Sequence, residues 1–71
     1  MENEIEFAVF CIENVAQQLQ ISAPEVYAAI AERSNLLAGY IIPNFEVLHT
    51  QSREYIVSDI IDAMKESGVS V

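Results

Sequence analysis

The sequence predicts an all-α fold, a compact single-domain bundle over residues 1–71 with three main helices and one or two short central helices. Apolar residues make up 52% of the 71 positions, which is enough for a packed interior in a chain of one-domain length. Three stretches repeat these residues every three or four positions, the spacing of an amphipathic helix. The chain holds only two glycines and two prolines, so long loops are not expected.

The first helix is expected from about residue 4 to about residue 19. Glu2, Glu4 and Glu6 stand at its start, where carboxylates stabilise the positive end of the helix dipole. Apolar residues then recur on one side of the helix for four turns. The face expected to be buried consists of Ile5, Ala8, Val9, Ile12, Val15, Ala16 and Leu19.

The second helix has a clear start signal in the sequence. Ser22 and Glu25 have the spacing of a capping box, and Pro24 lies in the first turn, where proline is favoured. Asn35 marks the expected end of this helix. The side expected to be buried carries Val26, Tyr27, Ile30, Ala31 and Leu37.

Residues 36–50 allow two interpretations. Apolar side chains at helical spacing fit a helix that is interrupted before Pro43. The other interpretation is a small hairpin at residues 40–48 with a Pro-Asn turn, which Gly39 favours. We favour two short helical pieces and keep the hairpin as the alternative.

The last helix is expected from about residue 52 to about residue 66. Thr50 or Ser52 can cap its start, and Gly68 stands where helices commonly end. Residues 67–71 are expected to form a frayed tail. The buried face of this helix is expected to consist of Ile56, Val57, Ile60, Ile61 and Met64.

The charge balance argues against several classes of function. Three Lys and Arg stand against 11 Asp and Glu, so the formal net charge is −8. Nucleic acids and anionic membranes attract basic proteins, so direct binding to either is not expected. A chain this short has little interior to spare for a deep catalytic pocket, so an enzyme is not expected. The acidic balance suits a basic protein partner, a cation, or solubility alone.

The single cysteine and the single histidine limit the chemistry further. Cys11 has no partner for an intrachain disulfide and is expected to be a buried, unreactive thiol. His49 has no second histidine with which to build a zinc site, so no metal or cofactor is predicted. The N-terminus is acidic, unlike a secretory signal, and no apolar run is long enough to span a membrane. A cytoplasmic protein is therefore expected.

The outer face of the last helix is one candidate surface for binding a protein. Its carboxylates can accept hydrogen bonds from Lys or Arg of a partner, and a tyrosine can serve as an aromatic anchor. The alternative is an ordinary solvated face, because charged residues on a helix usually face water. The residues of this stripe are Tyr55, Asp59, Asp62 and Glu66.

Phe7 and Phe10 form the second candidate surface. They lie away from the face of the first helix that is expected to be buried. Two exposed phenylalanines would be a poor surface for a soluble monomer. Either the chain covers the first half of this helix on all sides, or this half meets another chain.

Several short stretches also resemble a known family. They are Glu6-Phe7, Phe10-Cys11-Ile12-Glu13, Glu25-Val26-Tyr27, Tyr40-Ile41-Ile42, Glu46-Val47-Leu48-His49-Thr50-Gln51, Tyr55-Ile56-Val57 and Asp59-Ile60. They run from about residue 4 to about residue 65 and are similar to the domain-of-unknown-function family 3791, a family of short bacterial proteins. The most specific part is Leu-His-Thr-Gln followed by Tyr-Ile-Val-x-Asp-Ile.

The resemblance implies a small helical protein with no established activity or catalytic residue. It also implies pairing with a larger effector that is toxin-like or resembles an ADP-ribosyltransferase. It draws attention to a helix junction whose polar side chains either serve backbone amides or contact a partner. The positions concerned are Glu46, His49, Thr50 and Gln51.

The function expected from these observations is that of a protein-interaction module, as the partner of such an effector or as a homo-oligomer. The alternative is a helix-turn-helix-like transcriptional regulator, built from the second helix, the central segment and the last helix. The net charge of −8 disfavours that alternative, because such proteins neutralise phosphates with basic side chains.

Overall fold

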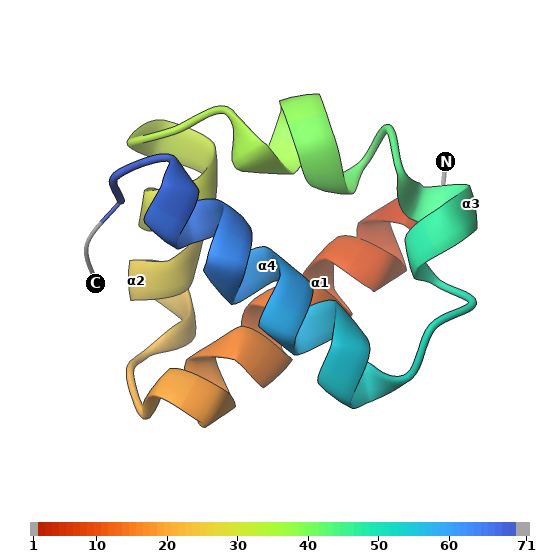
Figure 1. Ribbon diagram of the computed structural model, residues 1–71, viewed down its shortest axis with the longest axis horizontal. Helices are drawn as coiled ribbons and strands as arrows, with labels where there is room; N and C mark the ends of the chain where they lie inside the picture. Colours follow the sequence, from red (N-terminus) through yellow and green to blue (C-terminus); the bar gives the residue numbers. More distant parts are fainter. Residues whose placement is uncertain (1, 70–71) are drawn as a thin grey trace.

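The structure, a computed structural model, describes residues 2–69, and within them every regular element is helical. The helices in chain order are α1 (Glu2–Leu19), α2 (Ala23–Tyr27), η1 (Ala28–Glu32), η2 (Leu37–Ile41), α3 (Phe45–Leu48) and α4 (Arg53–Glu66) (Figure 1). The two η segments are single turns of π-helix. The radius of gyration is 10.8 Å, close to the roughly 11 Å of a compact chain of this length. The predicted all-α fold is confirmed.

α1 and α4 cross each other (Figure 1), and all six helices contribute side chains to the core. The α2–η1 segment packs beside the C-terminal end of α1, and α3 lies beside its N-terminal end (Figure 1). Among the described residues, no polar or charged side chain is buried. Any polar chemistry of this part of the chain is therefore confined to its surface. The largest fully buried side chains are Ile30, Ile41, Ile60, Val15, Val26 and Cys11.

The buried face of α1 differs from the predicted one. Ile5 and Val9 were expected in the core but are 61% and 47% exposed. Phe7 and Cys11 are buried in their place, while Ala8, Val15 and Ala16 are buried as predicted. The cause is a tertiary contact, because the ring of Phe45 from α3 packs edge-on against Phe7 and draws that side of α1 inward.

The end of α1 is a Schellman motif without glycine. The N–H of Ile21 donates to the carbonyl of Ala16 at 3.0 Å, and the N–H of Gln20 donates to the carbonyl of Gln17 at 3.3 Å. Gln20 has a φ of 58°, the left-handed conformation that this motif requires. A residue other than glycine pays about 1–2 kcal/mol for that conformation. This turn was not predicted from the sequence, because glutamine is not a usual residue for it.

The predicted capping box at the start of α2 is confirmed. The N–H of Glu25 donates to Ser22 Oγ at 3.3 Å, and the N–H of Ser22 donates to Glu25 Oε1 at 3.2 Å. The winding changes to a π-turn at Ala28, whose carbonyl accepts from the N–H of Arg33 at 2.8 Å. Tyr27, which was predicted to be buried, is exposed on this segment.

The central segment, residues 36–50, forms two short helices, as the favoured interpretation of the sequence predicts. The hairpin alternative at residues 40–48 is wrong, because η2 and α3 occupy most of that range. Pro43 lies between them, and the Asn44 side chain donates to the carbonyl of Tyr40 at 2.7 Å across the break. Ile41 of η2 points into the core, so this segment is part of the fold rather than a surface loop.

The last helix matches its prediction closely. Ser52 caps α4, its Oγ accepting from the N–H of Tyr55 at 3.1 Å. Gly68 ends the helix with a φ of 74° in a second Schellman motif, in which Val69 N–H donates to Met64 at 3.0 Å. Val69 packs against the core, and the rest of the predicted frayed tail, residues 70–71, lies outside the described residues. The buried face carries Ile56, Val57, Ile60 and Met64, with Ile61 half-buried.

Candidate functional site

An acidic hollow lies beside α4, toward η2. It has a volume of about 510 Å³, and no Lys or Arg is among the residues that line it. Asp59, Asp62 and Glu66 of the predicted stripe come together here because they follow one another along one side of α4. The hollow therefore concentrates negative charge on a shaped surface. The lining residues are Leu36, Tyr40, Asp59, Asp62, Ala63, Glu66 and Ser67.

The side chain of Tyr40 links η2 to α4 inside this hollow. Its hydroxyl donates to Asp59 Oδ2 at 2.6 Å, a short, charge-assisted hydrogen bond. This hydrogen bond, together with burial and the negative charge of Asp59, raises the pKa of Tyr40 to about 12. Tyr40 thus fixes the position of Asp59, while Asp62 and Glu66 stay exposed. Tyr40 and Leu36 were missed as site residues because nothing in the local pattern relates them to α4.

Replacing Tyr40 with phenylalanine tests this contact through its pH dependence. The raised pKa means that the hydrogen bond stabilises the fold below pH 10 and that this contribution is lost as the pH rises toward about 12. We expect Tyr40→Phe to lower the free energy of unfolding at neutral pH by about 1 kcal/mol, since the pair is only half-buried and water screens it. Urea unfolding should show the variant and the parent converging at high pH, with Tyr55→Phe as the exposed-phenol control. A difference that does not shrink would contradict the assignment.

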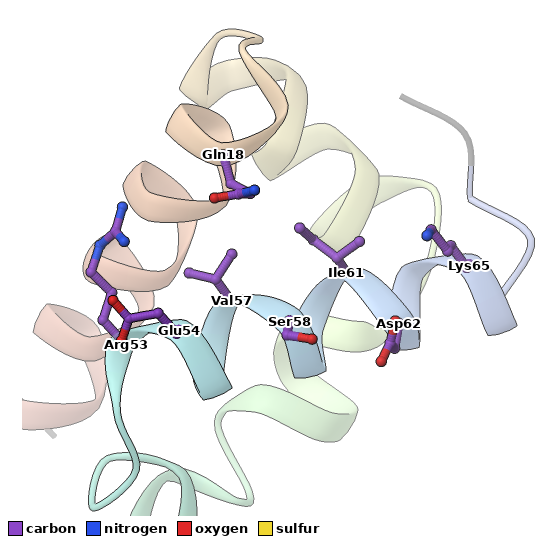
Figure 2. Close-up of a pocket in the computed structure, with 8 residues that line it drawn as sticks. All are labelled: Gln18, Arg53, Glu54, Val57, Ser58, Ile61, Asp62 and Lys65. Atoms are coloured by element: carbon purple, nitrogen blue, oxygen red, sulfur yellow. The ribbon is translucent and has the colours of Figure 1, made fainter.

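A second hollow lies on the other flank of α4, toward α1 (Figure 2). Val57 and Ile61 point from α4 into it, toward Gln18 of α1, and its volume is about 340 Å³ (Figure 2). Its charges are mixed, with two cations and two carboxylates among the lining residues, so its net charge favours no kind of ligand. The lining residues are Gln18, Arg53, Glu54, Val57, Ser58, Ile61, Asp62 and Lys65.

Arg53 closes one end of this second hollow. Its Nε donates to Asn14 Oδ1 and its Nη2 donates to Gln17 Oε1 at 3.1 Å, so the guanidinium ties the start of α4 to α1. The role of Arg53 is therefore mainly structural. Asp62 lines both hollows, which makes it the carboxylate that a ligand reaches from either flank of α4.

The two phenylalanines of α1 have different environments. Phe7 is 8% exposed and belongs to the core, which answers for this residue the question that the sequence left open. Phe10 is 37% exposed, and its ring stacks on Phe7 with the centroids 6.3 Å apart. One side of the Phe10 ring is thus held by the fold. Phe7 is corrected from candidate contact residue to core residue, and Phe10 remains a surface candidate.

The junction between α3 and α4 does not gather into a polar cluster. The N–H of His49 donates to the carbonyl of Phe45 at 2.9 Å, and the His49 ring lies against the Phe45 ring. The hydroxyl of Thr50 donates to the carbonyl of Val47 at 2.8 Å. His49 and Thr50 therefore donate to carbonyls at the end of α3, while Glu46 and Gln51 are exposed.

Cys11 is buried as predicted. It is 1% exposed, and burial raises the pKa of its thiol to about 12. The thiol is therefore protonated at neutral pH and shielded from reagents, which excludes a role as a nucleophile in this state. Within residues 2–69, no group of three His, Cys, Asp or Glu side chains is placed to hold a metal ion.

These features define a small all-α domain with an apolar core and an acidic, hollowed surface. The chain belongs to the family of proteins of unknown function DUF3791, whose family model matches residues 6–67. The resemblance found in the sequence is thereby confirmed. No curated protein and no solved structure matches the chain. None of the described helices is both long and apolar enough to cross a membrane.

Proposed function

We propose that this chain is a protein-interaction module that binds a basic segment of another protein through the acidic hollow beside α4. The observation that carries the proposal is the convergence of Asp59, Asp62 and Glu66 on one hollow whose lining includes no cation. Such a site attracts Lys and Arg, and its hollowed shape can fix their orientation. A basic face on a toxin-like effector is the partner class that fits both the charge and the family resemblance.

The arrangement of the hollow supports a pre-formed site. The hydrogen bond from Tyr40 holds Asp59 in place, so binding does not have to order that carboxylate first. Leu36 and Ala63 add apolar surface for the methylene stem of a long basic side chain. Two copies of the chain meeting through this hollow would place carboxylates against carboxylates, which favours a different protein as partner.

The test is a titration of the isotope-labelled protein with a disordered Lys/Arg-rich peptide, followed by NMR. We expect amide shifts concentrated at η2 and the C-terminal half of α4, and binding that weakens as salt is added. Asp62→Lys should weaken binding about tenfold, because it places a like charge in the hollow. Glu46→Lys is the matched control, because it makes the same change of net charge on α3, outside both hollows.

Two results would count against the proposal. Shifts spread evenly over all exposed carboxylates would mean that the peptide follows the net charge alone. Equal weakening by Asp62→Lys and Glu46→Lys would also mean that the peptide follows the net charge alone.

A titration with a DNA duplex in place of the peptide tests the helix-turn-helix alternative, which predicts that the protein binds the duplex at low salt.

A further inference from the structure

The outer face of α1 combines exposed apolar side chains with carboxylates. Val9 and Phe10 are exposed at the middle of this face, and Ile5 extends it by one turn. Glu6 lies one turn before them and Glu13 one turn after, both exposed. We call Glu6, Val9, Phe10 and Glu13 the α1 outer face. It shares no residue with the acidic hollow beside α4.

The fold does not use these apolar side chains for its core. The core row of α1 runs through Phe7, Cys11 and Val15, on the other side of the helix. A helix that needs only one apolar stripe usually has polar residues on its solvent side, so the exposed valine and phenylalanine there are unusual for a surface that meets only water. Phe10 is also held against Phe7, so its ring is a pre-ordered anchor that loses little entropy on binding.

A second copy of this chain does not fit the face. If two α1 helices pack antiparallel about Val9 and Phe10, Glu6 of each copy lies opposite Glu13 of the other. If they pack parallel, each glutamate faces its own copy. Both arrangements bring two pairs of like charges together around a small apolar contact, which costs free energy and removes specificity.

We propose that the α1 outer face is a second docking surface and that its occupant is a basic amphipathic helix of another protein. Charge complementarity selects this partner. If the partner helix carries a Lys or Arg one turn before and one turn after its own apolar pair, these cations lie opposite Glu6 and Glu13, whether the helix runs parallel or antiparallel to α1. The apolar pair of the partner covers Val9 and Phe10. This surface goes beyond the acidic hollow, which takes extended basic side chains.

The probe is a synthetic helical peptide of about 14 residues, four turns, with two leucines at the centre and lysines one turn to either side. A peptide of the same composition with the leucines and lysines scrambled is the first control. Fluorescence anisotropy of the labelled peptides measures affinity. We expect the patterned peptide to bind about tenfold more tightly than the scrambled one, since the two peptides have the same net charge and only the patterned one places its lysines and leucines to match the α1 outer face.

Matched variants locate the contact on the protein. Val9→Ser should weaken binding of the patterned peptide about tenfold, while Val47→Ser, which changes an exposed valine on α3, should change it less than about twofold. Glu13→Lys should weaken binding, while Glu32→Lys makes the same change of net charge on η1 and should not. Val9 and Glu13 are exposed, so both variants are expected to fold.

Three results would overturn the proposal. One is equal binding of the patterned and scrambled peptides. Another is weakening by Asp62→Lys that exceeds the weakening by Glu13→Lys, which would place the peptide in the hollow beside α4. The third is a dimer in sedimentation that Val9→Ser dissociates, which would make a second copy the occupant. Because the extended peptide tests the hollow and the helical peptide tests α1, failure of one proposal is separate from failure of the other.

Discussion

Phe7→Ala is expected to leave most of the protein unfolded at room temperature. Phe7 is buried, with the ring of Phe45 at a centroid distance of 5.3 Å. Removing a buried phenylalanine side chain costs about 3–5 kcal/mol through lost transfer free energy and the cavity left behind. A core in a chain of this length rarely supplies more than about 3–5 kcal/mol in total. The expected loss is therefore as large as the whole free energy of unfolding. Far-UV circular dichroism in a urea series should show it directly.

Phe10→Ala is the matched control for this experiment. Phe10 lies three residues from Phe7 on the same helix, but it is 37% exposed and lies outside the core. We expect it to lower the free energy of unfolding by only about 1 kcal/mol, the part of the ring that stacks on Phe7. Equal losses for the two variants would contradict the assignment of Phe7 to the core and Phe10 to the surface.

The start of the second helix and both ends of the last helix could be predicted because their signals are local, whereas the second helical segment ends at Glu32, before the expected Asn35. Ser22 and Glu25 satisfy each other within one turn, and Ser52 and Gly68 mark the two ends of α4 by the backbone geometry they favour. Each of these signals needs only neighbouring residues. The end of α1 lacked such a residue, yet the helix stops at Leu19 because Gln20 accepts the left-handed conformation.

The buried face of α1 could not be chosen from periodicity alone. The first half of the helix has apolar residues on nearly all sides, so the stripe through Ile5 and Val9 and the row through Phe7 and Cys11 both have helical spacing. Phe45 decides between them, and it lies far along the chain in a helix of four residues. A tertiary contact of this kind leaves no mark in the local pattern.

Only part of the candidate site could be predicted, because the rest of it also depends on a tertiary contact. Asp59, Asp62 and Glu66 share one side of α4, which spacing along a helix shows at once. Tyr40 reaches them from η2, 19 residues before Asp59, and η2 is a π-turn that no sequence signal announced. The carboxylates were therefore visible in the sequence, and the hollow that they line was not.

Ile41→Ala is the second variant with a large expected effect, because it tests the segment whose structure the sequence left open. Ile41 is fully buried, at 0% exposure, although it belongs to a helix of only five residues. We expect the free energy of unfolding to fall by about 2–5 kcal/mol, comparable with the whole stability of a domain this small. Urea unfolding followed by circular dichroism measures the loss.

Ile42→Ala is the control, because Ile42 is the next residue and only half-buried. Its loss should be about 1 kcal/mol, since less apolar surface leaves the core. The two variants delete the same atoms, so their difference reports which side of η2 faces the core. Equal losses, or a larger loss for Ile42→Ala, would mean that η2 is turned differently about its axis. Tyr40 would then not be directed at Asp59, and the acidic hollow would lose the residue that pre-orders it.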